Sequence, residues 1–144
     1  MRDEEGSAAL EFIAVGVLLL VPLVYLIVAL GAIQEQTLGV EAAARHTARA
    51  IARAPDSETA AARGEQVLDG VIEQYGLDGT TLEVTMECPG EDGECPQPGA
   101  TIVLTVTAHV SLPLIPAVFG VDEAAAVTVQ GSAVQKVSRT WGTG

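Results

Sequence analysis

An uninterrupted apolar segment near the beginning of the chain, from Phe12 to Ile33, constrains the fold more than any other feature. It contains no charged residue, and as a helix its 22 residues extend roughly 33 Å, enough to cross the hydrocarbon core of a bilayer. A single segment in lipid can satisfy its backbone polar groups only as a helix, in which Pro22 and Gly16 are tolerated. The sequence therefore predicts a transmembrane helix at residues 7–33, followed by one small domain at residues 34–144.

Composition excludes several classes of function. The net charge is −12 with seven Lys and Arg residues, whereas nucleic-acid binding requires a positive surface, so we expect no nucleic-acid partner. Aromatic residues are 3% of the chain, too few for a surface on which bases or sugars stack. His46 and His109 lie in different predicted elements, and no nucleophile, phosphate-binding or metal-ligand motif accompanies them. We expect no enzymatic activity, no metal and no cofactor.

A polar leader, residues 1–6, precedes the apolar segment, and the carboxylate of Glu11 stands at the border between them. Glu11 has two interpretations. Near a helix end its carboxylate reaches the headgroup layer and interacts favourably with the helix dipole. Alternatively, the polar leader, the small residue that follows it and the carboxylate of Glu11 together form a signal, which is cleaved on the cytoplasmic side before the apolar segment.

The residues Gly-Ser-Ala-Ala-Leu-Glu-Phe at 6–12, followed by a Leu/Val-rich run broken by Pro22, resemble the start of the TadE-like proteins of tight-adherence (Flp) pilus systems. The resemblance implies cleavage by a prepilin peptidase between Gly6 and Ser7. It also implies that Glu11 registers subunits by meeting a cation, such as the new amino terminus of a neighbour. The implied partners are the membrane, the peptidase, other pilin-like subunits and assembly platform proteins. Pilin-type leaders are usually basic, whereas this leader is acidic.

The helix should continue from the membrane into solvent as far as Ala54, before Pro55. Steps of four and three residues form a packing seam typical of a helix with one partner. The seam consists of Ile33, Thr37, Val40, Ala44, Thr47 and Ile51. A second face carries charged residues at four-residue steps: Glu41, Arg45, Arg49 and Arg53. This face is either solvated or in contact with an acidic domain surface or a neighbouring subunit.

The remaining sequence predicts an α+β fold, in which a second amphipathic helix and a small three-stranded antiparallel sheet follow the long helix. Asp56 or Ser57 should cap the second helix, which ends near Tyr75 because Gly76 follows. Its expected buried stripe is Val67, Leu68, Val71, Ile72 and Tyr75. Alternation with period two predicts two strands, whose inward residues are Leu82, Val84 and Met86 in the first and Ile102, Leu104, Val106, Ala108 and Val110 in the second.

A third strand is expected from about Ala125 to Val137, with Val127, Val129 and Ala133 inward and a bulge near Gly131. Pro113 and Pro116 interrupt strand pairing, so residues 112–120 should form a crossing loop or a single helical turn. We expect the tail, residues 140–144, to be loose.

The two cysteines, Cys88 and Cys95, flank a loop between the first two predicted strands. Their spacing favours a disulfide across a hairpin mouth, where it would fix the strand register; a reduced pair or a metal site are the alternatives. A disulfide and a cleavable leader place the domain outside the cytoplasm. Basic residues beyond the membrane favour the opposite orientation by count, but they lie a turn or more from it.

Three classes of function remain. The first is a minor pilin or pseudopilin of tight-adherence pilus biogenesis, processed after Gly6, single-pass and acting by subunit packing. The second is an unprocessed anchored accessory protein that binds an extracytoplasmic partner. The third is a secreted domain with an atypical signal peptide, although the apolar segment is longer than the usual signal.

Overall fold

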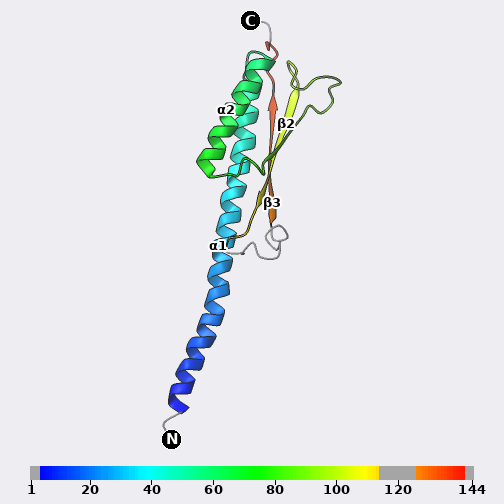
Figure 1. Cartoon of the computed structure of the whole chain (residues 1–144). Helices are drawn as coiled ribbons and strands as arrows, with labels where there is room; N and C mark the ends of the chain where they lie inside the picture. Colours follow the sequence, from blue (N-terminus) through cyan, green and yellow to red (C-terminus); the bar gives the residue numbers. More distant parts are fainter. Residues whose placement is uncertain (1–3, 114–125, 142–144) are drawn as a thin grey trace.

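The computed structural model describes residues 4–113 and 126–141, and it has the predicted α+β fold (Figure 1). The elements are α1 (Glu4–Ala52), α2 (Ser57–Tyr75), β1 (Glu83–Glu87), β2 (Thr101–Val110) and β3 (Val127–Lys136). Figure 1 shows α2 and the sheet packed along the C-terminal part of α1, while the N-terminal part projects away from them. The structure is a small domain at one end of a long helix.

Helix α1 runs without interruption from the apolar segment into the polar sequence, through Pro22. Continuity was expected because Pro55 is the first proline after the apolar segment. At the end of α1, the carbonyl of Ala52 accepts a hydrogen bond from the amide of Ser138 at 3.3 Å. The last turn of the helix is thus joined to the segment that follows β3.

Helix α2 has the predicted caps at both ends. The side chain of Asp56 accepts a hydrogen bond from the amide of Thr59 at 2.7 Å, and this bond lowers the pKa of the Asp56 carboxyl because it favours the ionised form. Gly76 ends the helix in the left-handed conformation with φ of 60°, which glycine adopts without a steric penalty. Local sequence alone is sufficient to set both ends of α2.

The sheet is antiparallel with the order β1-β2-β3, so β2 is its central strand. The five predicted inward residues of β2 are all buried, and they alternate with more exposed positions as expected. In β1, Val84 lies opposite Val106 and therefore shares the inward face, yet 40% of its surface is exposed. The reason is that β1 contacts β2 and no described helix, so Val84 lies on the predicted face but no helix covers it.

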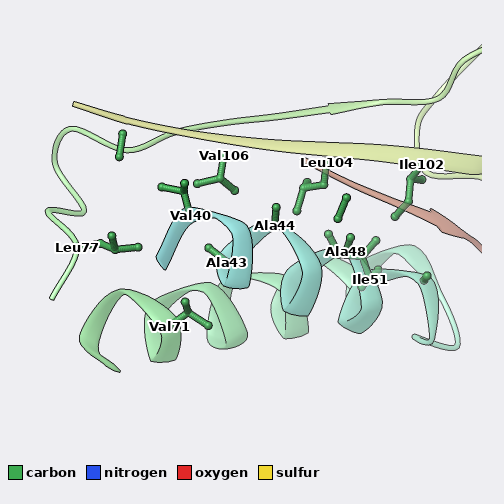
Figure 2. Close-up of a cluster of buried hydrophobic side chains, with 14 of the residues drawn as sticks. Val40, Ala43, Ala44, Ala48, Ile51, Val71, Leu77, Ile102, Leu104 and Val106 are labelled. Atoms are coloured by element: carbon green, nitrogen blue, oxygen red, sulfur yellow. The ribbon is translucent and has the colours of Figure 1, made fainter. Parts of the chain in front are cut away.

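Helix α1 lies between α2 and the sheet (Figure 2). On one side its small residues face β2 and β3, with Val40 beside Val106 and Ala44 beside Leu104. On the other side it packs against α2, whose Val71 is buried. Because both neighbours pack on α1, the core of the domain is organised around one helix.

The expected bulge near Gly131 is absent, since β2 and β3 pair residue for residue from Thr101↔Lys136 to Val110↔Val127. Gly131 serves a different purpose. A Cβ atom at this position would lie 2.6 Å from the backbone carbonyl of Val40 and from the amide nitrogen of Glu41. The residue must be glycine because β3 and α1 come into backbone contact there.

The tail prediction was wrong for Trp141, which is buried and belongs to the hydrophobic core. Backbone hydrogen bonds hold this segment in place. The amide of Val137 donates to the carbonyl of Ala100 at 2.9 Å, and the amide of Trp141 donates to the carbonyl of Ser138 at 3.4 Å. A large apolar side chain thus fixes the end of the described chain. The predicted crossing segment, residues 112–120, lies outside the described residues from position 114 onward.

Candidate membrane anchor and packing surfaces

The N-terminal part of α1 exposes its large apolar side chains on all sides. Phe12 is 81% exposed and Leu18 is 75% exposed, and Ile27 near the other end of the segment is 62% exposed. The other exposed large apolar residues of this part are Leu10, Ile13, Val15, Val17, Leu19, Leu20, Val21, Leu23, Val24, Leu26, Val28 and Leu30. Helix α1 is long and apolar enough to cross a membrane. A helix that is apolar on all sides and is not covered by other elements requires an apolar environment.

The predicted processing and registration residues all lie in the first part of α1. The backbone of Gly6 and Ser7 is helical. Glu11 follows one turn later, and its side chain is exposed. Among residues 4–113 and 126–141, no cation lies within ion-pairing distance of its carboxylate. Glu11 is thus a carboxylate at the N-terminal border of the apolar surface, and no described residue of its own chain is its counter-ion.

The predicted packing seam is a packing surface, and its partners belong to the same chain. Val40, Ala44 and Ile51 are buried in the core, and Ile33 packs against the core from its edge. Sheet and α2 cover the seam from Val40 onward. These residues therefore hold the domain on the helix, and a neighbouring subunit can reach only the other faces of α1.

Two glycines that the sequence analysis did not single out allow α2 to approach α1 closely. A Cβ atom at Gly64 of α2 would lie 3.1 Å from Ile51, and one at Gly39 of α1 would lie 2.8 Å from Leu77. Gly39, Ala43 and Thr47 recur every four residues on α1, and such small residues let helices pack at short distance. This spacing was the available signal for the face that α2 covers.

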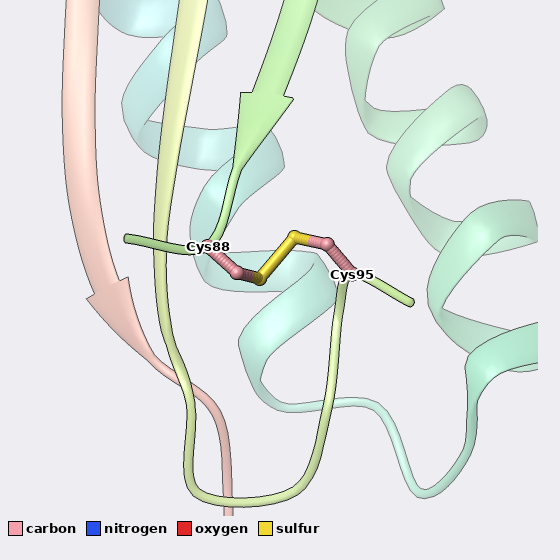
Figure 3. The surroundings of a disulfide bond; sticks show 2 residues. All are labelled: Cys88 and Cys95. Atoms are coloured by element: carbon pink, nitrogen blue, oxygen red, sulfur yellow. A yellow bond between two sulfur atoms is a disulfide. The ribbon is translucent and has the colours of Figure 1, made fainter. Parts of the chain in front are cut away.

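The disulfide between Cys88 and Cys95 is present, with the two Cα atoms 5.8 Å apart (Figure 3). Cys88 directly follows β1, whereas Cys95 precedes β2 by several residues. The bond therefore closes the loop between the strands without joining facing positions of the ladder. Both cysteines pack against the core, so the bond fixes this loop on the domain.

The charged face of α1 is solvent-exposed along one side of the domain. Arg45 forms an ion pair with Glu41 at 2.6 Å, as the four-residue spacing predicted. In the described part of the chain, Arg49 and Arg53 have no acidic partner within ion-pairing distance. A shallow groove of about 360 Å³ runs along this face and reaches Tyr75 at the end of α2. The arginines thus remain available for a contact outside the domain.

No group of three or more His, Cys, Asp or Glu side chains that could hold a metal ion exists within the described ranges. Two buried polar atoms there lack a hydrogen-bond partner, the Oγ1 of Thr47 and the Nε1 of Trp141. No protein-family model, curated protein or solved structure matches this chain. The described residues therefore provide a candidate membrane anchor and surfaces for packing.

Proposed function

We propose that this chain is a minor pilin-like or pseudopilin-like component of tight-adherence pilus biogenesis, as the TadE-like pattern at residues 6–12 implies. It is inserted in the membrane, cleaved between Gly6 and Ser7 by a prepilin peptidase, and passed to an assembly platform. Its domain lies outside the cytoplasm, where the Cys88–Cys95 disulfide is stable. Its role is structural and not enzymatic.

The observation that carries the proposal is the continuity of α1. One helix joins a bare apolar half, which begins beside the cleavage pattern, to a domain built around the other half. Such a helix can move out of a bilayer as one continuous element and pack its apolar half among the same halves of other subunits. Glu11 fits this process, because a carboxylate at the edge of an apolar surface is costly until a cation meets it.

The mass of the mature protein from its own host tests the processing step. The proposal predicts a chain that begins at Ser7. A chain that begins at Met1 would support the alternative, an unprocessed anchored accessory protein, which the acidic leader Asp3-Glu4-Glu5 favours. A chain that begins near Gln34 would indicate a secreted domain and would overturn both.

Replacement of Glu11 tests the registration step. We expect Glu11→Ala to be cleaved normally, since the bond between Gly6 and Ser7 is untouched, but to be absent from assembled pili or complexes. Glu35→Ala is the matched control, because Glu35 lies on the same helix beyond the apolar segment. Normal incorporation of Glu11→Ala would exclude the proposed pairing of the carboxylate.

A further inference from the structure

Charge is segregated on the domain. An exposed arginine stripe runs along the C-terminal half of α1 and just past its end. It consists of Arg45, Arg49 and Arg53, the last of which directly follows α1, with Leu38 at its N-terminal end. On β1 and in the disulfide loop, an acidic edge contains five exposed carboxylates and no basic residue: Glu83, Glu87, Glu91, Asp92 and Glu94. In a chain of net charge −12, the stripe is a basic surface that attracts an acidic one.

The stripe and the acidic edge lie on opposite sides of the domain. Gly131 of β3 comes against the backbone of α1 at Val40 and Glu41, and the groove along the stripe reaches Tyr75 of α2. The stripe therefore lies on the outer face of α1, between β3 and α2 and away from the buried residues of the helix. The acidic strand β1 is at the other edge of the sheet and contacts β2 alone among the described elements. One copy therefore cannot pair its own stripe with its own acidic edge.

The two surfaces also lie at matching heights along α1. Val84 of β1 is opposite Val106, and Val106 packs beside Val40 of α1, two residues from Leu38. One step farther from the anchor, Met86 is opposite Leu104, which lies beside Ala44. The disulfide loop then follows beyond Cys88, as Arg49 and Arg53 follow beyond Ala44. Two copies standing side by side in one membrane thus present the stripe and the acidic edge at the same level.

We infer that the arginine stripe of one copy docks against the acidic edge of a second copy. This inference rests on the membrane anchoring in the proposed function. Leu38 is 61% exposed and Val84 is 40% exposed, so they form the apolar part of the contact. Side chains alternate along β1, so Glu83 and Glu87 lie on the face opposite Val84, and the carboxylates of the disulfide loop make the charged pairs. Because the two surfaces differ, the contact is heterologous and adds copies in a row instead of closing a dimer. Charges on β1 also discourage backbone pairing with another sheet, so the contact is made by side chains.

Cysteine cross-linking in membranes that contain the full chain tests the contact. Leu38→Cys and Val84→Cys are made as separate tagged variants, co-expressed and oxidised. We expect a cross-linked heterodimer from the mixture and no cross-linked dimer from either variant alone. Val134→Cys replaces Val84→Cys in the control, because Val134 is 60% exposed but lies on β3. No cross-link in the mixture, or a dimer from Leu38→Cys alone, would overturn the inference.

Charge reversal then tests the pairing. The Leu38→Cys chain is given two further substitutions, Arg49→Glu and Arg53→Glu. The cross-linked fraction should then fall about tenfold, because like charges face each other. Glu91→Arg with Glu94→Arg in the Val84→Cys chain should restore it. An unchanged fraction after the first reversal, or no recovery after the second, would show that these charges do not pair. The result is separable from the processing proposal, since cross-linking in the membrane does not depend on a chain that begins at Ser7.

Discussion

The two halves of α1 are equally helical but are built from different residues for different surroundings. The anchor half, residues 8–30, presents large aliphatic side chains that are exposed all round. The domain half, residues 39–52, buries small residues, namely Gly39, Ala43, Ala44 and Ala48. Lipid adapts to side chains of any shape, whereas a sheet and a second helix can both pack on one helix only if its side chains are short. Hydrophobicity makes the first half a candidate membrane span, and side-chain size determines what can pack on the second half.

The largest expected effect concerns the contact between β3 and the domain half. Gly131→Val places a branched side chain where a Cβ atom alone would lie 2.6 Å from the backbone of Val40, so β3 must separate from α1. We expect a loss of about 3 kcal/mol in the free energy of unfolding of the domain, measured by urea denaturation. Gly16→Val is the control in the anchor half, where no atom lies within 4 Å of the added Cβ, and it should leave domain stability unchanged. If both variants changed the free energy of unfolding equally, close packing would not distinguish the domain half from the anchor half.

The same alanine-to-leucine substitution in each half of α1 tests whether side-chain size limits packing on the domain half. Ala44→Leu adds volume to a fully buried position between the helix and β2, and it should cost the domain about 2 kcal/mol. Ala14→Leu adds the same volume in the exposed anchor half and should not change domain stability. The difference between their urea midpoints measures the packing constraint. A tolerated leucine at position 44 would show that the domain half is not closely packed.

Removal of the disulfide should weaken the domain and leave the anchor unaffected. Cys88→Ser combined with Cys95→Ser opens a short loop, and the chain-entropy model gives a loss of about 2 kcal/mol. Thermal melting of the domain should report this loss, whereas resistance to carbonate extraction from the membrane should stay the same. Chemical reduction of the unsubstituted protein should reproduce the shift. Unchanged melting in both experiments would mean that the loop contributes little to the stability of the domain.

Thr47 offers a stabilising change in the domain half. Its Oγ1 atom is buried without a hydrogen-bond partner in the described residues, so valine, which has the same shape, removes an uncompensated polar group. We expect Thr47→Val to raise the free energy of unfolding by about 1 kcal/mol. Thr37→Val is the control, because the hydroxyl of Thr37 donates to the carbonyl of Ile33 at 2.7 Å. A destabilised Thr47→Val would show that the hydroxyl does make a compensating interaction.

The smallest effect is a dependence on pH at the start of α2. Hydrogen bonds from Thr59 lower the pKa of Asp56 in the folded state, so its carboxylate stabilises the fold above the unfolded pKa near 3.8. This contribution is lost as the pH falls through the lowered pKa. Asp56→Asn keeps the cap but cannot titrate, so its melting temperature should fall less than that of the unsubstituted protein below about pH 4. Parallel pH profiles for the two proteins would exclude this contribution.

Much of the fold was predictable because its signals are local. The end of α2 at Gly76 and the alternation in β2 depend on residues adjacent in the chain. The errors concern contacts between distant residues. Gly131 was interpreted as a bulge because a glycine in a strand has two common causes, and only the position of Val40 against it distinguishes them. Trp141 was assigned to a loose tail because nothing beside it in the sequence indicates burial.

For the candidate site, too, the sequence identified local features, whereas only the structure showed which distant segments they contact. Composition identified the anchor and the position of Glu11 beside it, and spacing identified the ion pair of Arg45 with Glu41. The seam was recognised as a packing surface, but its partner could not be, since a periodic stripe specifies a face and not what covers it. The structure assigns that face to the sheet and α2 of the same chain.

The sequence by itself determined that a long apolar helix leads into a small α+β domain, since hydropathy, helix caps and alternation act over a few residues. Only the tertiary structure decided that α1 lies between α2 and the sheet, that Gly131 brings β3 onto its backbone, and that the arginine stripe and the acidic edge lie on opposite sides. The physical reason is that close packing depends on which distant side chains meet, and a sequence pattern describes one surface at a time.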